Sequence, residues 1–236
     1  MNLIKSFATE IILVNTQLPE NLGATARCML NFEFDKLRLV KPCFSINHEK
    51  IVPVSTGANK VLKKIKVFKN FSDSIKDFNY VIGTTNRNRS LKKEQISIKK
   101  LKNLITRKKN KVAIVFGPEQ SGLDNEHLSL CDYTIKINTN KNFSSLNLSH
   151  AVAIICYDLT VQKSQNVGTE KRLRSVNLAK KNELISFYSA LEKSLDKSNF
   201  FNVKERKKIT FQKIKNIFSK LELSSDEIKI LISIFK

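Results

Sequence analysis

The stretch KVAIVFGPEQSGLDNEHLSLCDYTIKI, residues 111–137, contains two strand patterns with a helical pattern between them. It begins with a β-branched apolar run that ends at a glycine, and it closes with a second β-branched run at residues 133–137. Such runs are typical of strands. The segment between them, LDNEHLSLC, has acidic residues in its first turn, which favours a helix there. A helix between two strands is the repeating unit of a mostly parallel sheet.

The same alternation extends through the first 160 residues. Further strands are predicted at residues 10–14, 36–40 and 79–85. Helical patterns separate the strands, at residues 21–34, 55–65 and 97–109. The sequence therefore predicts an α/β fold with a mostly parallel sheet that helices cover on both faces.

A long apolar helix is predicted from Leu148 onward, in the stretch FSSLNLSHAVAIICYDL at residues 143–159. Leu148, Val152 and Ile155 recur at helical spacing, so most of this helix is expected to be buried. Ser and Asn residues crowd its start, where such side chains commonly accept hydrogen bonds from unpaired backbone N–H groups. The same side chains would also serve a binding site if other loops converge on them.

Four polar loops follow predicted strands, and in a parallel sheet such loops meet at one edge. They are VNTQLPENLGATAR, VIGTTNRNR, VFGPEQSGL and KINTNKNFSSLN. Gly83 and Gly117 come directly after strands, where a glycine lets a ligand approach the backbone, and Gly122 permits a tight turn. The loops contain no Ser–His–Asp set, no paired carboxylates and no G-x-G-x-x-G fingerprint, which disfavours hydrolytic and nicotinamide-dinucleotide chemistry.

The composition favours a globular protein of the cytosol. A chain of 236 residues that is 41% hydrophobic can bury a substantial core. No apolar run approaches the roughly 18 to 20 residues that span a bilayer, and the first 14 residues do not resemble a signal peptide. The four cysteines form no CxxC pair and the three histidines are far apart, so we expect reduced, mostly buried thiols and no metal site.

The charge is strongly positive and unevenly distributed. The formal net charge is +21, with 17 basic and 3 acidic residues at 60–111 and 17 basic and 8 acidic residues at 161–236. Two basic regions therefore flank a nearly neutral core. A polyphosphate partner such as RNA fits this distribution, whereas the alternative is a lysine-rich surface that only keeps the protein soluble.

The pattern changes after residue 160. Residues 161–176 are polar and basic without core periodicity, which is typical of a linker. Three helical patterns follow, at residues 184–195, 209–221 and 224–235, and the last begins with Ser-Ser-Asp-Glu, which can cap it. We therefore predict an α/β domain at residues 1–160, a basic linker at 161–176 and a small all-α extension at 177–236.

Three motifs resemble those of a known enzyme family. NLGATAR with Asn21 and Arg27, FGPEQSGL with Glu119, and SSLNLSHA with Ser145 and Asn147 resemble, in order and spacing, the motifs of the TrmH-like branch of SPOUT RNA 2′-O-methyltransferases. The match covers residues 10–160. VIGTTNRNR is similar to a loop of the TrmJ subgroup, and the three C-terminal helices are similar to the helical extension of that subgroup.

The resemblance implies a trefoil knot in the last third of the α/β domain, built around S-adenosylmethionine. It also implies a homodimer with its active sites at the interface, and tRNA as the substrate. The target would be the 2′ hydroxyl of nucleotide 32, C or U, in the anticodon loop. The residues implied to hold the cofactor are Thr84, Thr85, Asn86, Gly117, Ile137, Ser144, Ser145 and Leu146.

The resemblance makes Arg27, Asn21, Glu119, Ser145 and Asn147 the candidate catalytic residues. Arg27 is expected off the apolar stripe of its helix, where it would orient the ribose hydroxyl and stabilise its developing negative charge, although the family is often described with this arginine as a base. Asn21 and Asn147 have an alternative role as helix caps. Glu119 is expected to bind Asn21, Arg27 or backbone N–H groups, or to face water.

Arg87 and Arg89 alternate on the NRNR loop inside the most basic segment. This arrangement favours contact with RNA phosphates, with solubility as the alternative.

Two rival functions remain open from the sequence. The first is 2′-O-methylation of ribosomal RNA, or of another tRNA site, by the same fold. The second is a non-catalytic RNA-binding or ribosome-assembly protein that keeps the fold without turnover. Methyl transfer from S-adenosylmethionine to RNA would separate the enzyme from the binding protein.

Overall fold

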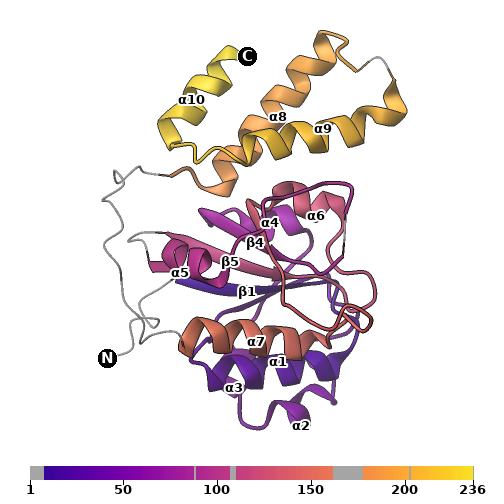
Figure 1. Cartoon of the computed structure of the whole chain (residues 1–236), viewed down its shortest axis with the longest axis vertical. Helices are drawn as coiled ribbons and strands as arrows, with labels where there is room; N and C mark the ends of the chain where they lie inside the picture. Colours follow the sequence, from indigo (N-terminus) through magenta and orange to yellow (C-terminus); the bar gives the residue numbers. More distant parts are fainter. Residues whose placement is uncertain (1–7, 88, 107–109, 162–177, 202, 236) are drawn as a thin grey trace.

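A computed structural model describes residues 8–87, 89–106, 110–161, 178–201 and 203–235 of the chain. Figure 1 shows an α/β layer structure with a group of three C-terminal helices lying against one side of it. The predicted linker lies outside the described residues, except for Val161 at the end of a helix.

Six strands form one sheet, and all five neighbouring pairs are parallel. The order across the sheet is β3-β2-β1-β5-β4-β6. The bounds are β1 (Ala8–Val14), β2 (Leu37–Val40), β3 (Lys66–Phe68), β4 (Tyr80–Thr84), β5 (Lys111–Phe116) and β6 (Tyr133–Ile135). The parallel sheet and the five predicted strands are confirmed, and β3 is an additional edge strand. The predicted trefoil knot is not tested by strand order and pairing, and it stays a prediction.

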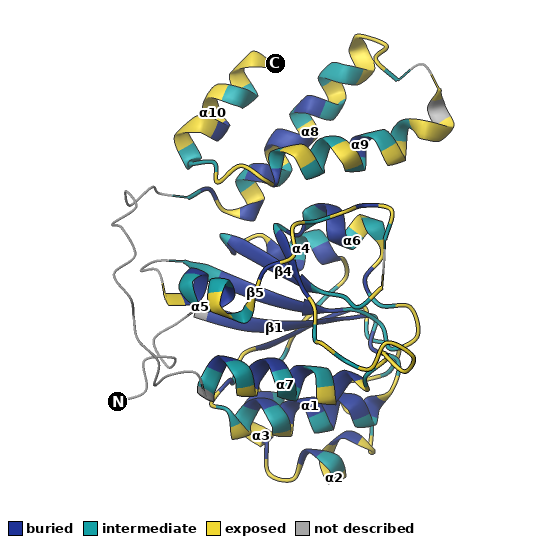
Figure 2. Cartoon of the chain, in the orientation of Figure 1, coloured by how far each residue is buried: buried dark blue, intermediate teal, exposed yellow. Residues whose placement is uncertain are grey.

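Helices cover the two faces of the sheet. Figure 1 shows α1, α3 and α7 together on one side, with α4 and α6 on the other. The bounds are α1 (Pro19–Asn31), α2 (Ile51–Ser55), α3 (Asn59–Leu62), α4 (Phe71–Ile75), α5 (Ile98–Thr106), α6 (Asn125–Leu130) and α7 (Leu148–Val161). Because successive strand residues point to opposite faces, Ile11 and Leu13 of β1 join one core, whereas Ile12 and Val14 join the other. Figure 2 shows the strands buried throughout the centre of the sheet.

The helix predicted at residues 55–65 is shorter than expected. Only α3 forms there, because Thr56 and Gly57 have positive φ angles of 41° and 82° and separate it from α2. Gly57 adopts this conformation without steric cost, whereas a β-branched residue such as Thr56 rarely does.

The C-terminal extension consists of α8 (Lys181–Lys197), α9 (Lys204–Phe218) and α10 (Ser225–Ile234), as predicted. A capping box begins α10: the backbone N–H of Ser224 donates to Glu227 and the Ser224 side chain accepts from the N–H of Glu227. The three helices enclose a hydrophobic core of their own around the fully buried Phe187.

The extension is fastened to the α/β domain by one buried ion pair and by partly buried hydrogen bonds. The Lys181 ammonium lies 2.5 Å from the Asp132 carboxylate, and both side chains are at most 10% exposed. Next to this ion pair, the hydroxyl of Tyr80 donates to Glu222 at 2.7 Å. Among the residues that the structure describes, none of the helices combines the length and hydropathy needed to span a bilayer.

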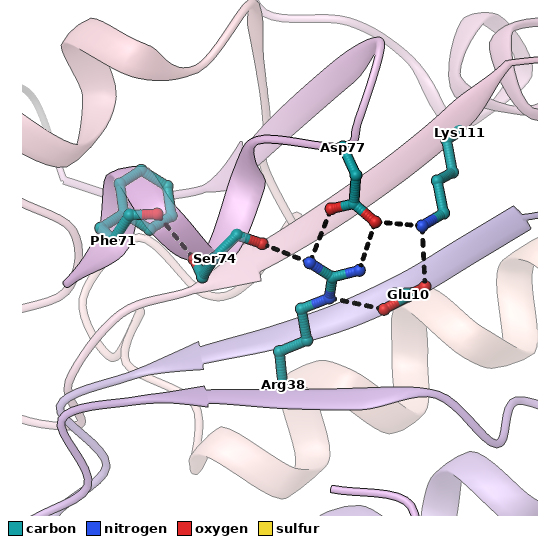
Figure 3. A network of polar contacts seen from close by, with 6 residues as sticks. All are labelled: Glu10, Arg38, Phe71, Ser74, Asp77 and Lys111. Atoms are coloured by element: carbon teal, nitrogen blue, oxygen red, sulfur yellow. Dashed lines mark hydrogen bonds and ion pairs between the residues drawn. The ribbon is translucent and has the colours of Figure 1, made fainter. Parts of the chain in front are cut away.

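An ion-pair network around the buried Arg38 and Glu10 side chains joins β1, β2 and β5 at the end of the sheet where these strands begin (Figure 3). The Arg38 guanidinium donates to Glu10 at 2.6 Å and to both oxygens of Asp77 at 2.7 and 2.8 Å, and it stacks on the ring of Phe78. Lys111 contacts both carboxylates. Desolvation raises the pKa of Asp77, but the hydrogen bonds and charges of Arg38 and Lys111 outweigh it and hold that pKa well below its ordinary value.

We expect Arg38→Ala to lower the free energy of unfolding by about 3 kcal/mol, because it leaves the Glu10 carboxylate buried without its closest partner. Urea unfolding measures this loss. The control is Lys60→Ala. The Lys60 side chain is 60% exposed and forms an ion pair with Asp35, so its loss should lower the free energy of unfolding by less than about 1 kcal/mol. Equal losses in the two variants would contradict a special role for the buried network.

Candidate active site

A relay of side-chain hydrogen bonds joins the three sequence motifs at the carboxyl end of the sheet. The Asn21 amide donates to Glu119 at 2.8 Å, and the Asn147 amide donates to the Asn21 carbonyl oxygen at 2.8 Å. The other Glu119 oxygen accepts from the backbone N–H of Gln17 at 3.0 Å. Of the alternatives considered for Glu119, the structure therefore shows Asn21 and backbone N–H groups as its partners, and not Arg27.

The loop after β5 folds back tightly and presents Glu119 to the start of α1. A Cβ atom on Gly117 would lie 2.3 Å from the backbone nitrogen of Leu123, so only glycine fits there. Gly122 has a φ of +66°, which completes the turn. The constraint at Gly117 is thus the packing of the loop against itself. Gly83, by contrast, lies inside β4 and faces apolar and cysteine side chains, so the expectation that it meets a ligand is wrong.

Asn21 does not cap α1. The helix begins at Pro19, its N-cap is Leu18, and no side chain caps it. Asn21 therefore lies inside the first turn, 5% exposed, with its amide committed to the relay. The alternative role of Asn21 as a cap is excluded.

Asn147 both caps α7 and belongs to the relay. Its side-chain oxygen accepts from the backbone N–H of Ser149 at 2.9 Å and from the Ser149 hydroxyl at 2.7 Å. Its amide nitrogen is left to bind Asn21. Ser144 and Ser145, immediately before it, are exposed.

The loops that follow β4 and β6 contact each other beside this relay. The Asn86 amide donates to the Ser144 carbonyl oxygen at 2.7 Å and to the Thr139 hydroxyl at 3.2 Å. The N–H of Thr85 donates to the Ile135 carbonyl oxygen at 3.1 Å. Thr139 did not stand out in the sequence, because a hydroxyl in a polar loop carries no pattern of its own.

The predicted cofactor residues occupy these loops or the strand ends next to them. Thr84 ends β4 and donates its hydroxyl hydrogen bond to the Val115 carbonyl oxygen of neighbouring β5 at 2.9 Å. Ile137 is half-buried against the core, and Leu146 is half-buried too. The resulting group combines hydroxyls, amides and backbone groups with two apolar side chains.

The two arginines of the NRNR loop contact the loop after β5. A guanidinium nitrogen of Arg87 donates to the carbonyl oxygen of Gln120, and one of Arg89 donates to that of Ser121. Arg87 remains exposed, whereas Arg89 is half-buried. Both guanidinium groups therefore fasten the two loops together, and their contact with RNA stays a prediction.

Arg27 lies apart from the relay. It is exposed on α1, as predicted, and its guanidinium donates to the Thr56 hydroxyl at 3.2 Å. Because α-helices rise about 1.5 Å per residue, Arg27 is about 9 Å farther along the helix than Asn21. The structure thus brings Asn21, Glu119 and Asn147 into contact but does not bring Arg27 to them.

Within the described residues, no group of three or more His, Cys, Asp and Glu side chains is arranged to hold a metal ion. Of the four free cysteines, Cys131 and Cys156 are buried, Cys28 is half-buried and Cys43 is exposed. Burial raises the pKa of the Cys131 thiol to about 12, which leaves it unreactive at neutral pH.

The fold and this set of loops define a methyltransferase of the SPOUT type. A model of the SpoU rRNA Methylase family matches residues 8–157, and the chain belongs to that family.

Proteins named TrmJ are similar over nearly the whole chain. The tRNA (cytidine-2′-O-)-methyltransferase TrmJ of Methanocaldococcus jannaschii is 33% identical, over 96% of this chain and 97% of that protein. The tRNA (cytidine/uridine-2′-O-)-methyltransferase TrmJ of Escherichia coli K12 is 28% identical over 94% and 91%. The crystal structure of TrmJ from Z. mobilis ZM4 superposes with a TM-score of 0.87 at 32% identity, over 96% of this chain and 97% of that one. These similarities include the C-terminal extension.

We expect Asn21→Ala to lower the free energy of unfolding by about 1 to 3 kcal/mol, because it removes two partly buried hydrogen bonds, one to Glu119 and one from Asn147. Chemical denaturation measures this loss. Asn31→Ala is the matched control, since it makes the same change at an exposed position of the same helix.

A double-mutant cycle with Asn147→Ala tests the relay directly. We expect the two changes to be coupled by at least about 0.5 kcal/mol. Strictly additive losses would show that the two amides do not act on each other.

Proposed function

We propose that this protein is a cytosolic tRNA 2′-O-methyltransferase that uses S-adenosylmethionine and modifies nucleotide 32, C or U, in the anticodon loop. The observation that carries the proposal is the Glu119–Asn21–Asn147 relay, which joins the three motif loops at one edge of the sheet. Similarity to TrmJ proteins over the extension as well as the domain supports tRNA as the substrate.

The chemistry of the loops after β4 and β6 suits S-adenosylmethionine. Thr84, Thr85 and Asn86 offer hydroxyl and amide groups, and the half-buried Ile137 and Leu146 offer apolar contact for a purine ring. The exposed Ser144 and Ser145 would close the site from the α7 side, and Gly117 marks the end of the neighbouring β5. When bound, the cofactor supplies a methyl group that its sulfonium makes electrophilic.

The residues of this chain would position the ribose and stabilise its oxygen. An in-line transfer needs the 2′ oxygen held about 3 Å from the methyl carbon, and that alignment accounts for much of the acceleration. The exposed Arg27 guanidinium would bind this oxygen as its hydroxyl loses a proton to solvent water. A guanidinium, whose pKa exceeds about 12, is a poor base, so orientation and charge stabilisation are its proposed role.

The three residues of the relay would not contact the substrate themselves: Asn21, Glu119 and Asn147 would position the parts of the chain that do. Their hydrogen-bonding groups are largely committed to one another, so they hold the start of α1 and the start of α7 in a fixed relation. Ser145 lies two residues before Asn147 and is exposed, which leaves its hydroxyl available to the nucleotide.

A homodimer with each active site at its interface is part of the proposal. Arg27 lies apart from the relay within one chain, so a second chain that approaches α1 and α7 would complete the site. Exposed apolar side chains on this side, Leu18 at 52%, Phe143 at 80% and Tyr157 at 50%, are consistent with such a covering surface.

The family description favours one rival. The matching family model is named for rRNA methylation, so ribosomal RNA is an alternative substrate. Another site in tRNA belongs to the same alternative. Incubation of the protein with tritiated S-adenosylmethionine and unmodified tRNA or rRNA transcripts, followed by mapping of the methylated nucleotide, separates these substrates. No transfer to either RNA would favour the non-catalytic RNA-binding alternative.

We expect Arg27→Ala to slow methyl transfer by roughly 100- to 1,000-fold while S-adenosylmethionine affinity changes less than twofold, because the guanidinium acts on the ribose oxygen. Single-turnover rates and calorimetry measure the two quantities. Thr56→Ala removes the hydrogen-bond partner of Arg27 but keeps the guanidinium, so it should transfer at nearly the wild-type rate. A variant that loses cofactor binding yet transfers normally at saturation would contradict the assigned role.

The extension offers a row of basic side chains for tRNA phosphates. Arg206 and Lys213 are seven residues apart on α9 and therefore lie on the same side of the helix, and Lys220 follows just beyond its end. All three are exposed, and none forms an ion pair with another residue in the described part of the chain. We propose that this row grips tRNA beyond the anticodon loop.

We expect exchange of both Arg206 and Lys213 for glutamine to weaken tRNA binding and to reduce the slope of log affinity against log salt by up to roughly 0.7 to 0.9 per lost phosphate contact. A filter-binding salt series measures the slope. The control exchanges Lys207 and Lys208, which already pair with carboxylates, and it should change the slope less. Indistinguishable slopes would remove the row from the tRNA-binding surface.

A further inference from the structure

A single strap connects the candidate cofactor loop to the extension. The strap consists of residues 85–87 and 89–96, between β4 and α5. At its start, Asn86 binds the Ser144 carbonyl oxygen and Arg87 binds that of Gln120. The strap therefore begins as part of the candidate active site.

The middle of the strap is fixed to the loop after β5 and to α6. Arg89 donates to the Ser121 carbonyl oxygen, and the Asn125 amide donates to the Ser90 hydroxyl at 2.7 Å. Leu91 is buried in the core on the α4 and α6 side of the sheet. A displacement of this segment would thus also displace the loop that carries Glu119.

Two residues of the strap, Lys92 and Lys93, contact α9 of the extension and the residue just after it, whereas residues 94–96 pair with Thr134 of β6. The Asn216 amide donates to the Lys92 carbonyl oxygen at 3.0 Å. The Lys93 ammonium donates to the hydroxyl of Ser219, just past the end of α9, at 2.6 Å. Ser219 is 8% exposed. Lys93 is half-buried, and this burial lowers the pKa of its ammonium group to about 8.

These contacts are separable from those that dock the extension as a whole. The ion pair of Lys181 with Asp132 and the hydrogen bond of Tyr80 to Glu222 fasten the extension to the residue before β6 and to β4, without involving the strap. Loss of the hydrogen bonds from Asn216 and to Ser219 would therefore leave these two docking contacts in place. They act instead on a segment whose other end lies among the predicted cofactor residues.

We propose that Asn216 and Ser219 are positioning residues for the cofactor loop, so that the C-terminal extension sets the affinity for S-adenosylmethionine as well as gripping tRNA. This inference rests on the proposed function. It differs from a strict division of labour in which the α/β domain alone determines cofactor binding, because the extension contacts the strap at Lys92 and Lys93, a few residues beyond Asn86. The coupling acts through hydrogen bonds along one continuous segment, and measured couplings of this kind typically change an affinity about fivefold or more.

The test uses full-length protein and the double variant Asn216→Ala, Ser219→Ala. We expect its Kd for S-adenosylmethionine, measured by calorimetry, to rise about five- to tenfold. In steady-state assays the KM for the cofactor should rise by a similar factor, while kcat at saturating cofactor should stay within twofold of wild type. Lys93→Met removes a contact from the strap side and should shift the Kd in the same direction, which guards against a folding defect in α9.

Tyr80→Phe is the matched control, because it removes a hydrogen bond between the domain and the extension without touching the strap. It should leave the cofactor Kd within twofold of wild type. An unchanged Kd in the double variant and in Lys93→Met, or an equal rise in Tyr80→Phe, would overturn the positioning role. A wild-type protein that neither binds S-adenosylmethionine nor methylates RNA would overturn the proposed function itself.

Discussion

Strand β5 hydrogen-bonds in parallel to β1 on one side and to β4 on the other, and this pairing determines where the polar loops of the molecule meet. Parallel neighbours require a crossover, so each chain segment returns to begin its next strand at the same end of the sheet. The carboxyl ends of β1, β4 and β5 consequently lie side by side. Asn21 and Glu119 form a hydrogen bond across 98 positions of sequence because their loops leave adjacent strands.

The relay then gives these loops a fixed geometry. An asparagine side chain can accept and donate at once, and Asn21 and Asn147 use both capacities, one toward each neighbour. Glu119 completes the chain by binding the backbone at Gln17. Groups so fully engaged suit positioning, whereas the exposed Arg27 and Ser145 retain the freedom to touch a substrate. The polar residues at the start of α7 therefore serve helix capping and loop geometry together.

Periodicity was sufficient to predict most of the fold, because buried parallel strands and the helices over them differ clearly in apolar spacing. Strand β3 escaped prediction since it is a three-residue edge strand in which Lys66 and Val67 are exposed. The helix α4 is only five residues long, and its local signals are the cap that Asn70 provides by accepting from the N–H of Asp73 and the acidic Asp73 in its first turn. Such short elements depend on tertiary contacts more than on pattern.

Within the site, the motifs identified the residues but not all of their partners. Asn21 looked like a helix cap because it stands near a helix start, yet Pro19 moves that start two residues earlier. Arg87 and Arg89 lie in a basic segment, which predicts contact with phosphates. In the structure their guanidinium groups donate hydrogen bonds to carbonyl oxygens of the loop after β5. Whether a guanidinium meets a phosphate or a carbonyl depends on what folding brings beside it.

The docking of the extension changes how the basic charge of the chain should be interpreted. The lysines of the extension differ in whether a carboxylate neutralises them. Lys181 forms a buried ion pair with Asp132, and Lys207 and Lys208 form ion pairs with other carboxylates. Ion pairing leaves the net charge of +21 unchanged but concentrates the uncompensated charge elsewhere, because 21 acidic residues can neutralise at most half of 42 basic ones. On α9 that surplus falls on Arg206 and Lys213, and the same helix contacts the strap through Asn216. One helix thus presents charge to a polyanion outside the molecule and hydrogen bonds to the segment that leads into the candidate site.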